Sequence, residues 1–302
     1  MTRVTIGERP PTYPSMPRAV LLVAVVVAAP CVACRERPHA IDARPPESHA
    51  AAPTSPPPAA TASTARAAAS AKGPADPADE ARVALPIGAR AHAGEAPPAG
   101  WCGETAIQEA LLYYGVWAPQ RAINRAGRPA HPDLYSNEMP AAMEALGLRL
   151  AWYAPRARGF DAFAEWARTA IDAGEPVLAG VKLLPTEHPE WGLDHFVLVV
   201  GYGERGLLVN TTWGHRQWIA KGATKGISLD STGWAARVRG VTLPTGMVPA
   251  RLVPVGESAA EITLRATCPA GFHVENRSSE VADLSVAEGT VTHVRCAPVR
   301  PR

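Results

Sequence analysis

Residues 100–115 read GWCGETAIQEALLYYG, and this stretch decides how the chain can be organised. Ile107, Leu111 and Tyr114 recur at the spacing of one helical face, and the closing glycine stands where a helix commonly ends. The stretch therefore predicts an amphipathic helix with Cys102 at its N-terminus.

The elements that follow come in two groups, helices first and strands later. Helices are expected over residues 138–146 and over 161–173, the second with Asp161 as its N-cap, and a strand is expected over 148–153. The hairpin turn at 203–206 makes the strands on either side of it antiparallel neighbours. The later strands are expected over 176–181, 195–202 and 206–209. Helices followed by a sheet are the α+β pattern.

The N-terminal third has a different composition. Residues 43–80 contain no Val, Ile, Leu, Met, Phe, Trp or Tyr, and Ala and Pro supply 22 of the 38 positions. Such a stretch cannot bury enough apolar surface to offset the entropy of ordering it. Residues 35–89 are therefore predicted to be a disordered tether.

Residues 1–34 have the pattern of an export signal. The apolar run 19–29 is too short to span a bilayer as a mature helix but fits the core of a signal peptide, and Met16 is a more typical start than Met1. The small residues before Cys34 are similar to a bacterial lipobox, although Cys31 occupies the position where Leu is usual. Lipidation at Cys34, ordinary cleavage and an uncleaved anchor remain alternatives, and the first implies membrane attachment outside the cytoplasm.

The charge pattern and the histidine spacing exclude two classes of function. The net charge is +2, and Lys and Arg are scattered without a basic stripe, so no nucleic-acid partner is expected. His188, His195 and His215 do not have the spacing of a metal site, so no metal is expected. No cofactor is implied either.

The five cysteines can be sorted by position. An oxidising compartment favours pairing of any two that can meet. Cys268 and Cys296 lie together in the segment 251–302, which is β-rich and has strand-like alternation over 261–266 and 289–295. We expect these two to form a disulfide that contributes about 3 to 4 kcal/mol to a small unit. Cys102 is then left unpaired.

The domain over residues 90–250 carries the residues that could do chemistry. Cys102 is predicted to be a thiolate nucleophile because a helix N-terminus lowers the pKa of a thiol, and its backbone amide could donate to an oxyanion. His195, at the start of a hydrophobic strand, would be the base. Asn210 ends the neighbouring hairpin strand and is expected beside His195 as its orienter, whereas Asp194 should point to the opposite face.

These segments resemble the papain-like peptidase C39 family. The likeness covers residues 100–214 and consists of Cys102-Gly103 at a helix start, His195 before a hydrophobic run ending in Gly-Tyr, and Asn210 after the next strand. The resemblance implies a papain-like fold in which Cys102 is the nucleophile, His195 the base and Asn210 the orienter. The substrate would be a peptide or protein.

One departure from the family separates two hypotheses. The family usually has a Gln about six residues before the cysteine, where this chain has Ala96. A missing oxyanion donor can cost about a hundredfold in rate. The chain is therefore either an exported thiol hydrolase that forms an acyl-enzyme at Cys102, or a catalytically silent peptide-binding module of the same fold.

Overall fold

The computed structural model describes most of the chain from Asp76 onward. The expected signal region, lipidation at Cys34 and the tether up to residue 75 lie outside the described residues, as do Ala96 and Asp194. The described ranges are 76–92, 100–129, 132–154, 159–183, 195–230, 233–258 and 260–299.

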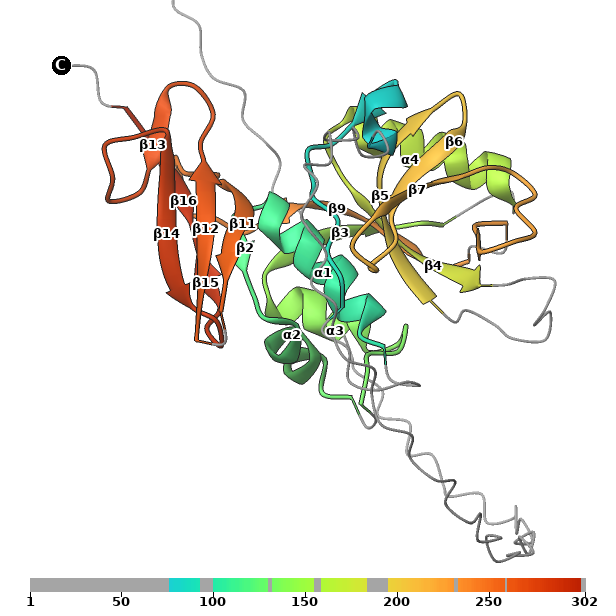
Figure 1. Ribbon diagram of the computed structural model, residues 1–302, viewed down its shortest axis with the longest axis horizontal. Helices are drawn as coiled ribbons and strands as arrows, with labels where there is room; N and C mark the ends of the chain where they lie inside the picture. Colours follow the sequence, from blue (N-terminus) through green and yellow to red (C-terminus); the bar gives the residue numbers. More distant parts are fainter. Residues whose placement is uncertain are drawn as a thin grey trace, which may run out of the picture. The chain divides into compact units, whose positions relative to one another are not determined.

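The described residues form a mixed α+β structure with antiparallel sheets (Figure 1). The helices are η1 (Pro77–Glu80, a 3-10 turn), α1 (Cys102–Tyr113), α2 (Gln120–Gly127), α3 (Met139–Ala145) and α4 (Phe160–Asp172). The strands are β1 (Val83–Ala84), β2 (Val116–Trp117), β3 (Leu148–Trp152), β4 (Val177–Leu183), β5 (His195–Gly203), β6 (Gly206–Asn210), β7 (Arg216–Ile219), β8 (Ile227–Ser228), β9 (Ala235–Val241), β10 (Val248–Pro249), β11 (Arg251–Glu257), β12 (Glu261–Thr267), β13 (Phe272–Val274), β14 (Val281–Ala287), β15 (Thr292–His293) and β16 (Arg295–Pro298).

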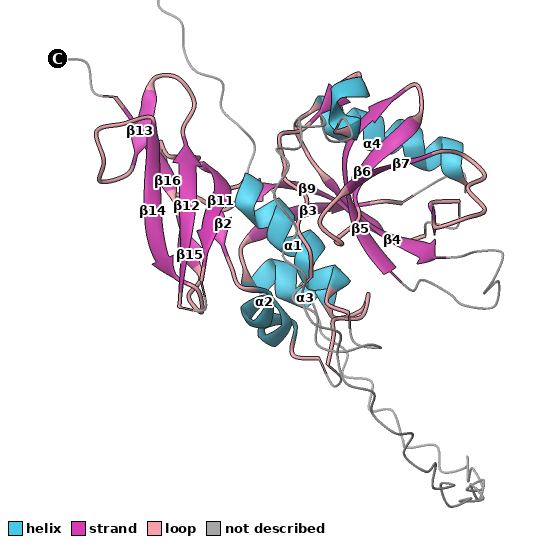
Figure 2. Ribbon diagram, viewed as in Figure 1, coloured by secondary structure: helices cyan, strands magenta, loops and turns pink. Residues whose placement is uncertain are grey.

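The largest sheet has β5 near its centre. Its strands run in the order β3-β9-β4-β5-β6-β7, every neighbouring pair is antiparallel, and β1 and β8 pair with β5 and β4. The predicted hairpin between β5 and β6 is confirmed. Helices α1, α2 and α3 gather at one side of this sheet (Figure 2).

Both faces of the sheet are covered, which explains why β5 reads as a continuous apolar run. Leu198 and Val200 pack in the core that contains α1, and the alternate residues Val197 and Val199 pack in the core that contains α4. Because side chains alternate along a strand, β5 contributes to two hydrophobic cores at once.

The helix ends follow the sequence signals with one exception. Gly115, Gly147 and Gly174 all have φ between 74° and 78°, the left-handed conformation that closes a helix. The expected N-cap Asp161 is wrong, because α4 begins one residue earlier and Gly159 occupies the cap position. Asp161 lies instead in the first turn, where a carboxylate favours the helix dipole.

The expected boundary between tether and domain is also wrong. Residues 76–89 were assigned to the tether, but η1 and β1 lie there, and β1 pairs with β5 through Val83↔Tyr202. Leu85 and Ile87 are buried in the core of α1. The stretch without apolar residues ends at Glu80, and the alternating apolar residues after it supply the strand.

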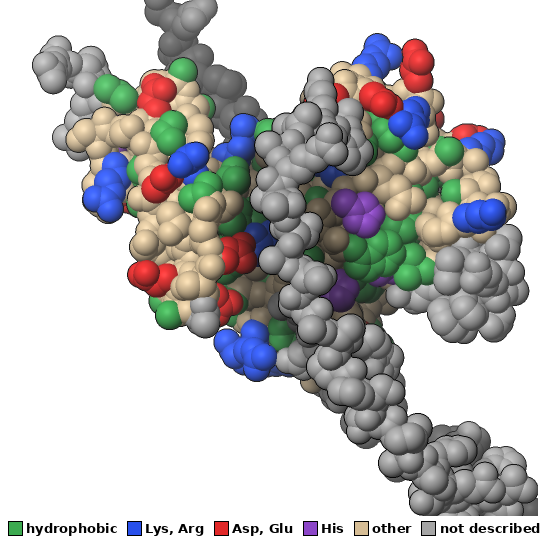
Figure 3. Space-filling view, in the orientation of Figure 1, with side chains coloured by type: hydrophobic (Ala, Val, Ile, Leu, Met, Phe, Trp, Pro, Cys, Tyr) green, Lys and Arg blue, Asp and Glu red, His purple; other side chains and the backbone are tan. Residues whose placement is uncertain are grey.

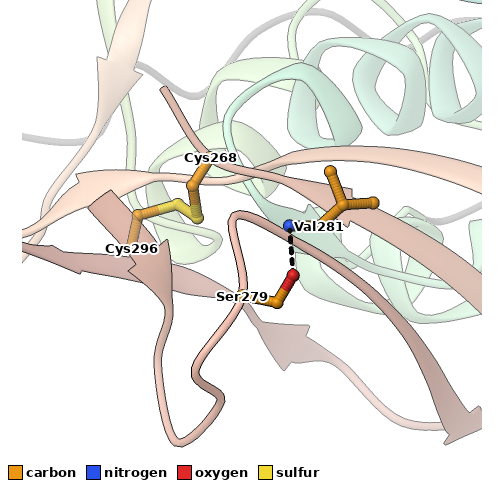
Figure 4. Close-up of a disulfide and its surroundings, with 4 residues drawn as sticks. All are labelled: Cys268, Ser279, Val281 and Cys296. Atoms are coloured by element: carbon orange, nitrogen blue, oxygen red, sulfur yellow. Dashed lines mark hydrogen bonds between the residues drawn. A yellow bond between two sulfur atoms is a disulfide. The ribbon is translucent and has the colours of Figure 1, made fainter. Parts of the chain in front are cut away.

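The C-terminal segment folds as small antiparallel sheets, β11-β12-β14 and β10-β16-β13. The predicted disulfide between Cys268 and Cys296 is confirmed (Figure 4). The expected strand over 289–295 is wrong in extent, because β14 precedes it and only the short β15 and the first residue of β16 fall within it.

This segment shares its core with the rest of the domain. Leu112 from α1 and Trp117 from β2 are buried among Leu252, Ile262 and Cys296. In addition, β15 pairs with β2. The C-terminal segment therefore packs directly onto the helix that begins with Cys102.

Candidate functional site

Cys102 begins α1 as a free cysteine. The pKa of this thiol is raised to about 12, chiefly by burial and in smaller part by the carboxylates of Glu104 and Asp133, while the backbone amides of Phe196 and Gly103 act to lower it. The expected net lowering at the helix N-terminus is wrong, because desolvation of the thiolate outweighs the helix dipole. The resting group is a thiol.

The contact with Phe196 places the sulfur at the start of β5. The Phe196 amide, which lowers the pKa of the Cys102 thiol, belongs to the peptide bond that joins His195 to Phe196. The next residue of α1 is also close to Phe196, because a β-carbon added at Gly103 would lie 3.5 Å from the Phe196 ring. The fold thus brings the first residue of α1 against the first peptide of β5, although they are more than ninety residues apart in sequence.

His195 is buried at the start of β5, and the turn after β6 holds its ring. Its Nε2 lies 2.9 Å from the Thr211 carbonyl oxygen and 3.3 Å from the Thr212 hydroxyl. The Trp213 ring stacks on the imidazole with centroids 4.6 Å apart, and Trp213 itself is 40% exposed. Histidine side chains border hydrophobic ones on the face that Figure 3 draws.

Asn210 is not beside His195. The β5–β6 ladder pairs Asn210 with Leu198, so His195 extends three residues beyond that pair and lies next to the turn that follows. The Asn210 side-chain amide donates to the carbonyls of Ile87 and Gly88, at 3.4 and 3.2 Å, and its side chain contacts Glu109. The expected adjacency is wrong because β5 extends further from the hairpin turn than β6 does, and the bulge between Val199 and Gly201 brings Asn210 only one residue nearer to His195.

The Cys102 amide, expected to be an oxyanion donor, is already engaged. It donates to the Gly100 carbonyl at 2.8 Å. An amide with a protein acceptor at this distance does not point to an incoming oxyanion. In this structure the expected role of the Cys102 backbone is therefore not available without a local change.

A buried carboxylate beside the cysteine was missed. Glu104 is fully buried, and its Oε1 accepts hydrogen bonds from the Asn124 side chain and the Leu134 amide, at 2.8 and 3.0 Å. Burial raises the pKa of Glu104 to about 7, so its charge changes near neutral pH. Its position two residues after the cysteine was visible in the sequence, but a Glu in the first turn of a helix is usually expected to be exposed to solvent.

Thr211, Thr212 and Trp213 are the other residues that sequence reasoning missed. They contact the His195 ring directly, as described above. The sequence signal for them was weak. Asn210, Thr211 and Thr212 follow an apolar strand, and of these three only Asn210 has a side chain of the type that commonly orients histidine.

Comparisons with known proteins give no family for this chain. No protein-family model matches it, and no curated protein matches it. Within the described ranges, no group of His, Cys, Asp and Glu side chains could hold a metal ion. No helix in that same part is long and apolar enough to cross a membrane.

Proposed function

We propose that the chain is a thiol hydrolase in which Cys102 attacks a peptide or amide carbonyl and His195 is the base. The observation that carries this proposal is that the Phe196 amide lies close enough to the Cys102 sulfur to lower the pKa of the thiol, because this brings the thiol to the residue that follows His195. A papain-like arrangement, with a helix that carries the cysteine and a strand that carries the histidine, is the corresponding fold proposal.

The contacts of His195 support its role as the base. Its Nε2 lies 2.9 Å from the Thr211 carbonyl, which can only accept a hydrogen bond, so Nε2 carries the hydrogen. In the neutral ring the lone pair is then on Nδ1, the nitrogen that takes the cysteine proton. A backbone carbonyl thus serves the role that was expected of Asn210.

The raised pKa of Cys102 decides how the reaction begins. A thiol with a pKa of about 12 does not form a resting thiolate and imidazolium pair at neutral pH, so proton transfer to His195 accompanies attack. The sulfur bonds to the carbonyl carbon as its proton passes to Nδ1, and the tetrahedral intermediate expels the amine with that proton. Water, activated by the same base, then hydrolyses the thioester and restores the thiol.

The test is cleavage of a peptide library by the purified chain, followed by mass spectrometry. Cys102→Ala and His195→Ala are expected to abolish cleavage, whereas the matched control His273→Ala, on β13 in the C-terminal segment, is expected to leave it unchanged. Cleavage that persists in Cys102→Ala would refute the proposal.

Two observations favour a second candidate, a silent peptide-binding module. These are the raised pKa of Cys102 and the engagement of its amide by Gly100, because one lost oxyanion donor costs about a hundredfold or more in kcat. The two candidates differ in one measurement. A module would retain peptides from the same library without cleaving any of them.

Glu104 gives a test of the thiol environment that needs no substrate. At pH 8 its carboxyl is mostly charged and raises the pKa of Cys102; at pH 5 it is neutral. Glu104→Gln should therefore increase the rate of iodoacetamide labelling at pH 8, by up to about tenfold for one pKa unit, and leave the rate at pH 5 unchanged. An equal change at both pH values would mean that the substitution acts through packing instead of charge.

A further inference from the structure

Thr212 has a backbone conformation that its residue type disfavours. Its φ is 67°, in the left-handed region, and it is fully buried. A β-branched residue in that region is an outlier, because the branched side chain crowds the backbone. Within the described ranges, Arg128 and Asn276 are the other residues besides glycine with positive φ, but Arg128 caps a helix and Asn tolerates this region.

The strained residue lies at the ring of His195. The Thr212 hydroxyl is 3.3 Å from Nε2 of His195 and donates to the Thr211 carbonyl at 2.5 Å. That same carbonyl accepts from Nε2 at 2.9 Å. The carbonyl of Thr212 in turn accepts from the His92 amide at 2.9 Å.

The backbone angle explains why the carbonyl faces the ring. The peptide plane that carries the Thr211 carbonyl is attached to Thr212 through φ, so the left-handed value fixes the direction of that oxygen. Thr211 cannot rotate freely on its other side, because its amide and hydroxyl both donate to the carbonyl of His215, at 3.1 and 2.9 Å. Strain kept at such a position is typical of a site whose geometry matters.

We infer that Thr212 is the positioning residue of this site. Its left-handed backbone turns the Thr211 carbonyl toward Nε2 of His195, and its hydroxyl holds that carbonyl in place, so that the ring keeps its hydrogen on Nε2 and its lone pair on Nδ1. Glycine adopts this φ without strain, so the backbone conformation of the turn does not by itself explain why a threonine occupies this position. The effect on turnover rests on the proposed function; the effect on the ring does not.

Three substitutions separate the hydroxyl from the backbone. Thr212→Ser keeps the hydroxyl, Thr212→Val keeps the β-branch without the hydroxyl, and Thr212→Gly relieves the strain and removes the hydroxyl. The readout is the ¹⁵N NMR spectrum of the His195 ring in the full chain, where the two nitrogens report which one carries the hydrogen. His195→Ala, which removes the signal, assigns it.

Thr212→Ser is expected to keep the wild-type ring spectrum. Thr212→Gly should fold, as judged by a Tm close to that of the wild type, yet show a mixture of the two neutral ring forms. On a peptide that the wild type cleaves, Thr212→Gly should lower kcat tenfold or more with KM within about twofold, and Thr212→Ser should stay within about twofold in both.

The outcomes distinguish this inference from the proposed function. If the wild type cleaves no peptide but Thr212→Gly still alters the ring spectrum, the proposed function fails and the positioning role stands. If Thr212→Gly folds and keeps the wild-type ring spectrum, the inference is overturned, whatever happens to turnover. Should Thr212→Val not fold, the glycine and serine variants still decide the question.

Discussion

Glu109 on α1 offers a sharp test of the buried polar contacts. Its side chain is fully buried, and its Oε1 accepts the Arg90 amide at 2.7 Å. Its Oε2 has no hydrogen-bond partner, and neither has Oδ1 of Asn210, whose side chain contacts the same carboxyl. A protonated carboxyl would give Oε2 a hydrogen to donate, whereas a charged one would leave a buried acceptor without a partner.

The raised pKa of Glu109 favours the protonated carboxyl, and burial is its cause. Burial raises it from 4.5 to about 8, although the Arg90 amide, the Asn210 side chain and the charges of Arg90 and Arg216 lower it. A carboxyl with a raised pKa in the folded state binds its proton more tightly there than in the unfolded chain. Its contribution to stability is therefore fully present below pH 4.5 and is lost as the pH rises to about 8.

The size of the effect follows from the shift. One pKa unit corresponds to about 1.4 kcal/mol, so Glu109 alone lowers the free energy of unfolding by at most about 5 kcal/mol between pH 4.5 and 8. Glu104, with a pKa of about 7, acts in the same direction over part of that window. Glu109→Gln removes the pH dependence due to Glu109 and leaves that due to Glu104, because an amide does not titrate and can accept from Arg90 at every pH.

The assay is urea unfolding of the full chain at pH 5, 6.5, 8 and 9. The wild type should lose stability as the pH rises, and Glu109→Gln should show a flatter profile and exceed the wild type at pH 8 and above. Glu144→Gln, the same change at an exposed position of α3, should follow the wild type. If Glu109→Gln were less stable than the wild type at pH 9, Glu109 would be a charged partner of the nearby arginines and the reasoning would be wrong.

Three further predictions concern stability. Replacing Cys268 and Cys296 by alanine should cost about 3 to 4 kcal/mol, as expected for the 28-residue separation, and the non-reduced wild type should give a linked peptide pair in mass spectrometry. Arg90→Ala should cost about 2 kcal/mol in urea unfolding, because its side chain is 17% exposed and its guanidinium contacts α1, β2 and β11. Arg205→Ala, with a side chain 61% exposed, should stay within about 0.5 kcal/mol. Gly206→Ala should lower the Tm measurably, since a β-carbon there would lie 2.2 Å from a backbone oxygen of β7; an unchanged Tm would show that the hairpin can shift.

The sequence predicted the main elements because their signals are local. Helix periodicity and closing glycines located α1, α3 and α4, and a continuous apolar run located β5. The strand β1 was missed because it has two residues, and β9 was missed because its interrupted pattern AARVRGV carries little signal; both obtain their stability from the neighbours they pair with. The disulfide was predicted correctly because elimination left two cysteines close together in the chain.

The site was predicted less completely, for reasons that are not local. The contact of Cys102 with the start of β5 followed from residue types and order, but the place of Asn210 depended on strand register. The contacts of His195 with Thr211 involve a backbone carbonyl, which every residue possesses, so no residue type signals it. The direction of the Cys102 pKa depended on burial, which helix position alone does not give.

The short strand β1 has a mechanical consequence. Only two residue pairs join it to β5, with flanking hydrogen bonds from Arg82 to Tyr202 and from Leu85 to Val200. A pulling force applied at the N-terminal end of the described chain would load the ion pairs of Asp76 with Arg216 and of Glu80 with Arg205, and then these few bonds, before it reached α1. Beyond them, the hydrogen bonds from Asn210 and Arg216 to the Ile87 carbonyl would bear the load next, followed by the contacts of Arg90 with α1. This arrangement would let the N-terminal stretch of the described chain peel away stepwise under tension, before the long strands of the sheet are loaded.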